Sequence, residues 1–244
     1  MDFRIFDGRS TEAVISSLGG TVLSFKVGGK DILYPYAMNE DGKARGGCPI
    51  CAPWFGKTEF GEKKHGFLRN LEANEVRREG EDSIVFSFSH EGISEYPWGI
   101  EYHLIVSVVS GMLKMFLTTK RIDDGLFNSA PVNLAFHPYF ALNGGRISVT
   151  EGRTTYVDCF SEQSTSIETG NPSVLIENGK SQIVMSFGGS TDERSRLVFW
   201  SDSKEKYACI EPVLTDKKFF NTSEGHRLHL NNSPLSLFMS LAVL

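Results

Sequence analysis

The sequence reads YHLIVSVV at residues 102–109 and LKMFLTTKR at residues 113–121, and these two segments indicate the fold class. Both are rich in β-branched, aromatic and aliphatic side chains, and apolar residues alternate with polar ones along much of their length. Such alternation is typical of strands, because successive side chains of a strand point to opposite faces of a sheet. We therefore predict two β-strands here.

Segments of the same kind recur along the chain. We predict further strands at Ala13–Leu18, Thr21–Val27, Ser83–His90, Gln182–Phe187, Arg196–Trp200 and Leu235–Leu244. Turn signals lie between them at Gly19-Gly20, Gly28-Gly29, Asp124-Gly125, Asn143-Gly144-Gly145 and Gly188-Gly189. Many short strands with no long segment of helical periodicity predict an all-β fold, an antiparallel sandwich or barrel.

Nothing in the composition divides the chain. It has 244 residues, 40% of them hydrophobic, without a linker, a repeat or a low-complexity tract. A chain of this length can form one core, so we predict a single domain over residues 1–244. Two stretches depart from the strand pattern: residues 41–70, a long loop with several aromatic residues, and Thr150–Lys180, a polar excursion that we expect to cover one end of a site.

Charge and composition exclude several classes of partner. The formal net charge is −5 and the sequence pI is about 5.7, so the chain offers no basic face to nucleic acid or to anionic lipid. No apolar run approaches the ~20 residues that span a bilayer, and the first ten residues do not resemble a signal peptide. Of the four cysteines only Cys48 and Cys51 form a CxxC, and no second CxxC completes a zinc cluster. We expect reduced thiols and a cytoplasmic protein.

Three segments combine titratable residues with bulky neighbours: residues 64–70 (KHGFLRN), 133–140 (NLAFHPYF) and 210–212 (IEP). His137 precedes a proline, which cannot continue a central ladder, so it should lie where a strand ends. Glu211 follows an apolar strand, and a buried carboxylate is costly unless it has a partner or a task. Near neutral pH a Glu with pKa ~4.3 and a His with pKa ~6.5 can serve as general base and general acid.

The order of these motifs resembles the aldose 1-epimerase superfamily, closest to its hexose-6-phosphate 1-epimerase-like branch. The segment RGGCPICAPWFG at residues 45–56 is followed by HGFLRN at residues 65–70. HPYF at residues 137–140 is similar to the family's second-histidine motif, and Glu211-Pro212 is similar to its late Glu-Pro. The resemblance implies an antiparallel β-supersandwich of the galactose mutarotase-like type and a cofactor-free interconversion of the α and β anomers of a hexose or hexose 6-phosphate.

The resemblance also implies roles for individual residues. Glu211 would take the proton of the anomeric hydroxyl, and His137 would protonate the ring oxygen. His65 and Arg69 would hydrogen-bond hydroxyls or the oxygen that gains charge. An Asp that binds sugar in the family corresponds to Asp158.

Other residues are candidates for substrate contacts. Trp54 lies within the motif loop and could stack on a sugar, and Arg45, Arg69 and Lys57 could clamp a phosphate. The phosphorylated and the free sugar remain alternatives, because Val213 follows Glu211-Pro212 where the phosphate-handling branch has a Trp.

Two other functions are compatible with the same residues. His65, His137 and Glu211 could instead form the two-His-one-carboxylate site of a metal-dependent sugar isomerase. The chain lacks the close H-x-H pair that such barrels often use. A non-catalytic carbohydrate-binding sandwich would use the aromatic residues and Arg69 without needing the Glu–His pair.

Overall fold

The computed structural model describes residues 1–40, 42–58, 64–123, 130–142, 146–190, 196–203, 206–215, 229–230 and 233–244. The turns predicted at Asp124-Gly125 and Asn143–Gly145 lie outside these residues. Strands dominate the described ranges, and the one helical element in them is the 3₁₀ turn η1 (Leu68–Asn70). No helix in these ranges is long and apolar enough to cross a bilayer.

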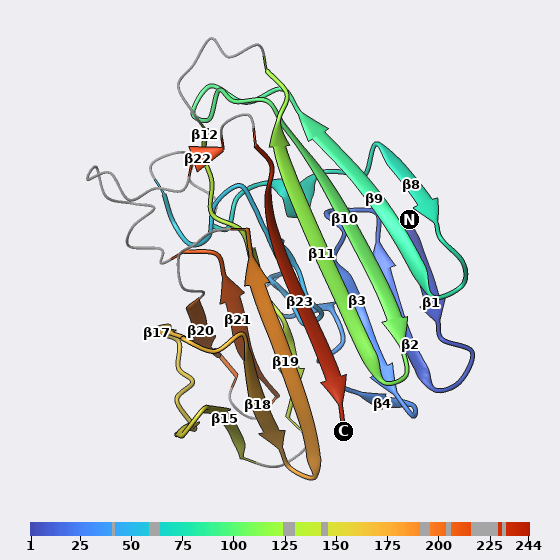
Figure 1. Cartoon of the computed structure of the whole chain (residues 1–244), viewed down its shortest axis with the longest axis vertical. Helices are drawn as coiled ribbons and strands as arrows, with labels where there is room; N and C mark the ends of the chain where they lie inside the picture. Colours follow the sequence, from blue (N-terminus) through green and yellow to red (C-terminus); the bar gives the residue numbers. More distant parts are fainter. Residues whose placement is uncertain are drawn as a thin grey trace.

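Three antiparallel sheets account for most strands (Figure 1). The largest contains, in spatial order, β16 (Thr154–Val157), β15 (Ile147–Glu151), β18 (Ser173–Asn178), β19 (Ser181–Gly189), β23 (Leu235–Val243), β11 (Met112–Arg121), β10 (Ile100–Val109), β9 (Ser83–His90) and β8 (Glu75–Arg78). The second contains β17 (Thr165–Glu168), β20 (Arg196–Trp200), β21 (Tyr207–Val213), β13 (Ala135–Phe136) and β7 (Ile50–Cys51), with β14 (Tyr139–Ala141) also paired to β21. The third contains β1 (Asp2–Phe6), β2 (Thr11–Ser16), β3 (Val22–Val27) and β4 (Lys30–Asp31).

Two short ribbons complete the described strands. They pair β5 (Ala37–Met38) with β6 (Ala44–Arg45), and β12 (Ala130–Pro131) with β22 (His229–Leu230). All strand pairs are antiparallel, so the all-β, antiparallel prediction is confirmed.

Two local predictions are wrong. The stretch Thr150–Lys180, expected to be a weakly patterned polar excursion, instead contains β16, β17 and β18, although its residues Glu162 and Ser164 do line the pocket described below. Its strands are short and partly exposed, which weakens their apolar alternation. Gly188-Gly189 is not a turn but the end of β19, where Gly188 is paired with Phe238 of β23. A Cβ at Gly188 would crowd the ring of Phe238, so this glycine serves close side-chain packing.

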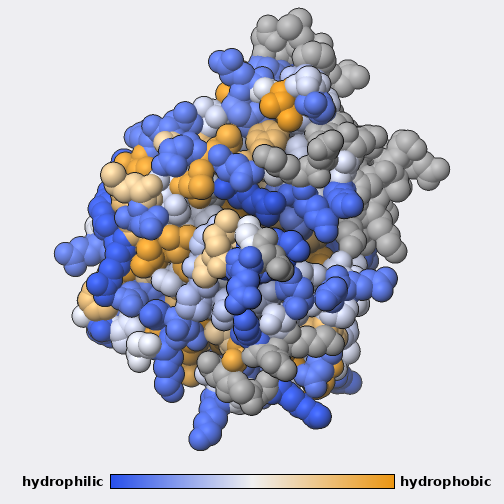
Figure 2. Space-filling view, turned by 180° about the vertical axis from the view of Figure 1, so that it is seen from behind, coloured by the Kyte–Doolittle hydropathy of each residue, from blue (hydrophilic) through white to orange (hydrophobic). Residues whose placement is uncertain are grey.

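The core lies between the nine-stranded sheet and the two smaller sheets. Alternate residues of β10 are buried, among them Leu104 and Val106. Leu104 packs on Gly20 so closely that a Cβ at Gly20 would overlap it, and the rings of Phe3 and Phe86 meet edge-on at 5.7 Å. These contacts join the four-stranded sheet to the large one. The surface in Figure 2 shows mainly hydrophilic side chains with apolar patches between them.

The six-stranded sheet is covered on one face and open to a pocket on the other. Phe199 of β20 contacts Tyr156 of β16, with ring centroids 5.7 Å apart. Its neighbours Val198 and Trp200 point to the opposite face and line the pocket. All seven residues of β21 are buried, because the large sheet covers one face of this strand and the walls of the pocket surround the other.

Replacing Leu104 by Ala tests this packing. Leu104 is 0% exposed, whereas its neighbour Ile105 points outward and is 37% exposed. We expect Leu104→Ala to lower the free energy of unfolding by ~2–5 kcal/mol through lost burial and a cavity. Ile105→Ala should lower it by less than about 1 kcal/mol. Urea denaturation of both variants measures the difference, and equal losses would contradict the inward orientation of Leu104.

Candidate active site

Strand register brings His137 and Glu211 together. In the antiparallel pairing with β21, Ala135 of β13 faces Val213 and Tyr139 of β14 faces Cys209. His137 lies midway between Ala135 and Tyr139, so the same register places it opposite Glu211. The predicted strand end at His137 is confirmed, because β13 stops at Phe136 and β14 begins at Tyr139.

The pair belongs to a row that crosses the sheet. Val198 of β20 is the partner of Glu211 on its other side, and the backbone N–H of His137 donates to the carbonyl of Pro49 at 3.0 Å. Pro49, His137, Glu211 and Val198 all line one pocket, with a volume of about 840 Å³. The sequence suggested that Glu211 follows the end of a strand. In the structure it lies within β21, because Pro212 is still paired with Leu197.

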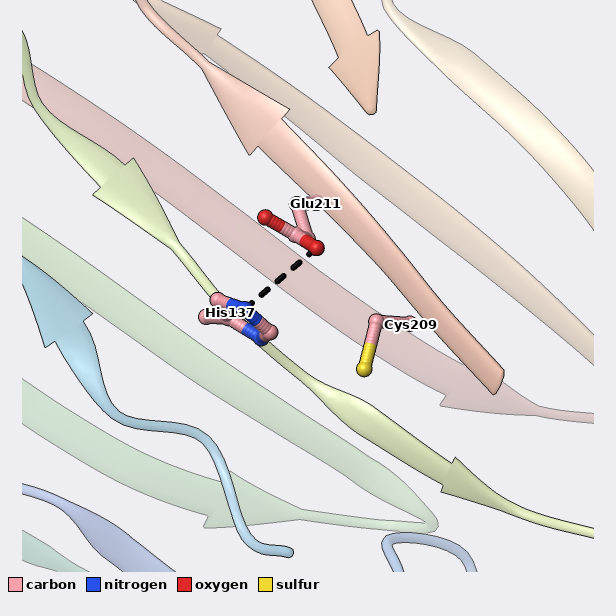
Figure 3. A group of neighbouring side chains, drawn as sticks. All are labelled: His137, Cys209 and Glu211. Atoms are coloured by element: carbon pink, nitrogen blue, oxygen red, sulfur yellow. Dashed lines mark ion pairs between the residues drawn. The ribbon is translucent and has the colours of Figure 1, made fainter. Parts of the chain in front are cut away.

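The two catalytic candidates are in contact and almost fully buried. Nε2 of His137 lies 3.4 Å from Oε1 of Glu211 (Figure 3), and the residues are 7% and 1% exposed. Burial, with the nearby charges of Arg69 and Arg45, lowers the pKa of His137 to about 3. At neutral pH the contact is therefore between a neutral imidazole and the carboxyl group of Glu211.

His65 reaches the same pocket from the long loop. Its ring meets the ring of His137 edge-on, with centroids 5.5 Å apart. The N–H of Gly56 donates to Nδ1 of His65 at 3.2 Å, and the N–H of His65 donates to the carbonyl of Gly56 at 2.8 Å. Because Nδ1 accepts a hydrogen bond, the neutral ring carries its proton on Nε2, which makes that nitrogen a donor.

Glycine makes this placement of His65 feasible. Gly66 has φ +67°, and a Cβ there would overlap the carbonyl oxygen of Ala52. The N–H groups of Phe67 and Leu68 both donate to the same carbonyl at 3.0 Å. The loop is thus tied closely to Ala52, the residue that follows β7.

Arg69 and Arg45 occupy different parts of the pocket wall. Arg69 lies on η1, and its guanidinium donates to the carbonyl of Lys64 at 2.9 Å. The guanidinium of Arg45 lies 5.3 Å above the ring of Trp200, and its Nε donates to Asp202 at 3.0 Å. Lys57 is exposed and also lines the pocket. The structure therefore brings His65, Arg69, Arg45 and Lys57 to the pocket that holds the Glu–His pair.

Two predicted binding residues lie elsewhere. Trp54 is 2% exposed and packs in the core, edge-on to Phe67 at 5.4 Å, and it is not part of the pocket wall. Asp158 is exposed, does not line the pocket and faces Nε of Arg146 at 3.5 Å. Neither residue lies on the wall of the pocket that holds His137 and Glu211, so the substrate contacts of Trp54 and Asp158 stay predictions that the pocket geometry does not support.

Two aromatic residues of the pocket wall, Tyr139 and Trp200, were not among the predicted site residues. Tyr139 stacks on His137, with centroids 4.8 Å apart and planes inclined by 16°. Trp200 meets the same imidazole edge-on at 5.9 Å. Both face Cys209 in the row next to His137 and Glu211. Period-two alternation could have identified Trp200, because it lies two residues from Val198 on a predicted strand.

The three ligands of the metal-dependent alternative, His65, His137 and Glu211, do not form one cluster of donor atoms. Among the described residues, one group of donor atoms lies within 4.8 Å of one another, and it consists of His137, Cys209 and Glu211. His65 is not part of that group, so the two-His-one-carboxylate set is absent from the described part of the chain. All four cysteines are free thiols, as predicted.

Comparison with known proteins agrees with this architecture. A "Putative glucose-6-phosphate 1-epimerase" of Salmonella typhimurium is 28% identical over 149 residues, covering 57% of this chain and 48% of the relative. A protein of the same description from Escherichia coli K12 is 25% identical over 178 residues, covering 69% and 58%. The chain thus spans about half the length of the curated relatives it matches.

Solved structures establish the fold. The Slr1438 protein of Synechocystis sp. PCC 6803 superposes with a TM-score of 0.80 at 20% identity, covering 100% of this chain and 95% of that one. A galactose mutarotase-like protein of Lactobacillus casei gives 0.81 at 14% identity, with both chains fully covered. The expectation of a galactose mutarotase-like antiparallel β-supersandwich is therefore confirmed.

The family assignment rests on the sequence itself. The profile of the aldose 1-epimerase family, described as "Aldose 1-epimerase", matches residues 1–171. That range includes His65, Arg69 and His137 and ends before Glu211, which the strand register adds to the site. Since the match covers more than half of the sequence, the chain belongs to the aldose 1-epimerase family.

Proposed function

We propose that this protein interconverts the α and β anomers of a hexose, with Glu211 and His137 as the acid–base pair. The observation that carries the proposal is the contact of these two side chains at 3.4 Å on the pocket wall. The anomeric hydroxyl and the ring oxygen of a hexose are bonded to the same carbon. A base and an acid that act on both must therefore be close neighbours, as these two are.

The reaction opens and recloses the sugar ring. Glu211 takes the proton of the anomeric hydroxyl while protonated His137 gives a proton to the ring oxygen, and the bond between C1 and the ring oxygen breaks. The product is the open-chain aldehyde. Rotation about C1–C2 presents the other carbonyl face, and reclosure with the proton transfers reversed yields the other anomer.

The neighbouring donors assist this chemistry. Nε2 of His65 is the donor nitrogen of a neutral ring, since Nδ1 accepts from Gly56. It can hydrogen-bond the oxygen that gains charge, and Arg69 adds a fixed positive charge on the same pocket wall. Tyr139 and Trp200 pack on the ring of His137 and restrict its orientation.

The acid role of His137 requires a proton that it does not hold in the empty pocket at neutral pH. Burial keeps its pKa near 3 there, so protonation accompanies the binding of substrate. The developing negative charge on the ring oxygen stabilises the imidazolium at the moment of transfer.

The charges of the pocket wall favour a phosphorylated hexose. Five cationic side chains line it among the described residues, against two carboxylates; the cations are Lys43, Arg45, Lys57, Lys64 and Arg69, and the carboxylates are Glu162 and Glu211. This excess of positive charge contrasts with the net charge of −5 of the whole chain. The two curated relatives carry a glucose 6-phosphate name, which supports a hexose 6-phosphate as substrate.

Removing either member of the pair should abolish most activity. We expect Glu211→Gln and His137→Asn each to reduce anomer exchange by ~10²–10⁴-fold, because each removes one proton-transfer group. Magnetisation-exchange NMR on glucose 6-phosphate and glucose, with spontaneous mutarotation subtracted, measures the rate. Glu177→Gln, on the exposed side of β18, is the matched control and should exchange at the wild-type rate. Wild-type rates in both pair variants would indicate a carbohydrate-binding protein without this mechanism.

The pH profile should show the low pKa of His137. Above that pKa the protonated fraction falls as pH rises, by up to about tenfold per pH unit. We expect kcat/KM to decrease between pH 6 and pH 8 in the wild type, and the residual rate of His137→Asn to lack this decrease. A flat wild-type profile over the same range would argue against His137 as the proton donor.

Arg45 should distinguish phosphorylated from free sugar. We expect Arg45→Ala to raise KM for glucose 6-phosphate by about 10–100-fold, the loss of one hydrogen bond to a charged group, and to change KM for glucose much less. Arg77→Ala, an exposed substitution on β8, should leave both values unchanged. Equal increases for the two sugars would remove the phosphate assignment while leaving epimerisation intact.

A further inference from the structure

We propose that His137, Cys209 and Glu211 form a zinc site at which Zn²⁺ binds the catalytic pair and inhibits the enzyme. The inhibition by bound zinc rests on the proposed function, whereas the binding of zinc to these three residues does not. The three residues are buried, and their donor atoms lie within 4.8 Å of one another (Figure 3). Cys209 has no part in the epimerase mechanism, so its position beside the pair calls for a separate explanation.

The strand geometry brings the donor atoms of all three side chains close together. Cys209 and Glu211 are two residues apart on β21, so they project from the same face. His137 enters from the neighbouring strand segment, opposite Glu211 by register. Because two strands of one rigid sheet carry the donors, the site needs no rearrangement of loops.

The distances suit a tetrahedral ion. Zinc bonds of ~2.3 Å to sulfur and ~2.0–2.2 Å to nitrogen and oxygen place ligand atoms roughly 3.3–3.6 Å apart. Nε2 of His137 and Oε1 of Glu211 are already 3.4 Å apart. Since all three donor atoms lie within 4.8 Å of one another, the thiol of Cys209 has to approach by at most roughly 1.2–1.5 Å, which a side-chain rotation can supply.

The donor set selects the metal. A thiolate, an imidazole and a carboxylate favour Zn²⁺, and the sulfur disfavours Mg²⁺ and Ca²⁺, which take oxygen ligands. On binding, the thiol gives its proton to solvent and sulfur bonds to the ion. His137 and Glu211 line the pocket while Cys209 lies behind them, so the fourth coordination position opens toward the pocket.

The surroundings indicate reversible rather than structural binding. A histidine ligand usually donates its second nitrogen to a carboxylate or carbonyl, and loss of such a partner costs about 10–100-fold in affinity. Nδ1 of His137 is buried and has no hydrogen-bond partner within the described ranges. Zinc would therefore enter and leave, and while bound it would occupy both proton-transfer groups.

Cobalt spectroscopy on untagged wild-type protein tests the site directly. Co²⁺ bound by a cysteine thiolate gives an intense near-ultraviolet charge-transfer band, and added Zn²⁺ should remove it by competition. We expect the band in the wild type and in Cys51→Ser, an equally buried thiol on β7, and no band in Cys209→Ser. Isothermal titration with Zn²⁺ should show binding at least about tenfold weaker for Cys209→Ser. Absence of the band in the wild type, or equal zinc affinity in all three proteins, would overturn the site.

Anomer exchange of free glucose tests the inhibition, since a phosphorylated sugar would itself bind the metal. We expect Zn²⁺ to slow wild-type and Cys51→Ser exchange, EDTA to restore it, and Cys209→Ser to need at least about tenfold more Zn²⁺ for the same fractional loss. A cobalt band with unchanged or faster exchange would refute inhibition by the bound metal. If metal-free wild type did not accelerate anomer exchange, that result would count against the proposed function alone. The cobalt spectra test the metal site separately.

Discussion

The site depends on one constraint, the register between β21 and the interrupted strand formed by β13 and β14. Ala135 faces Val213 and Tyr139 faces Cys209, and the residues between them are not paired in the ladder. Pro138 and Pro212 lack the N–H that a continuous ladder would use. His137 and Glu211 lie opposite each other within this gap in pairing. Their side chains face a pocket instead of packing against another layer of structure.

Burial gives this pair its chemical character. An imidazole exposed to water would be partly protonated near pH 6.5, whereas the surroundings of His137 hold its pKa near 3. The walls that exclude water are aromatic, with Tyr139 stacked on the imidazole and Trp200 at its edge. In such surroundings a charge that appears on a bound sugar interacts more strongly with nearby donors than it would in water.

The rigid parts of the molecule hold groups that a loop alone could not position. The N–H groups of Phe67 and Leu68, directly after His65 and Gly66, donate to the Ala52 carbonyl, and Gly66 allows an approach that a Cβ would block. Arg45 is held by Asp202, which also accepts a hydrogen bond from Tyr207. Asp202 thus orients the guanidinium over Trp200 and offsets part of its charge.

The same strand register explains why a thiol lies beside His137 and Glu211. Cys209 occupies the position between Tyr139 and Trp200, one row from Glu211, and its buried side chain packs with Tyr139. A cysteine satisfies the packing as a small apolar residue and adds a soft metal ligand. Packing and metal affinity therefore have a common origin in the register.

The sequence by itself determined the strands and the parts of the site. Apolar alternation located β9, and a compact run of aliphatic and aromatic residues located β20, both with their observed bounds, because these patterns depend on local sequence alone. The motifs that contain His65, Arg69, His137 and Glu211 identified groups that the fold brings to one pocket. Tertiary structure alone decided which aromatic and acidic residues face that pocket. Trp54 lies within the motif loop and Trp200 on a separate predicted strand, yet Trp54 packs in the core and Trp200 lines the pocket. The reason is that the face a side chain occupies depends on register and on the packing of sheets formed by distant segments, which no local pattern records.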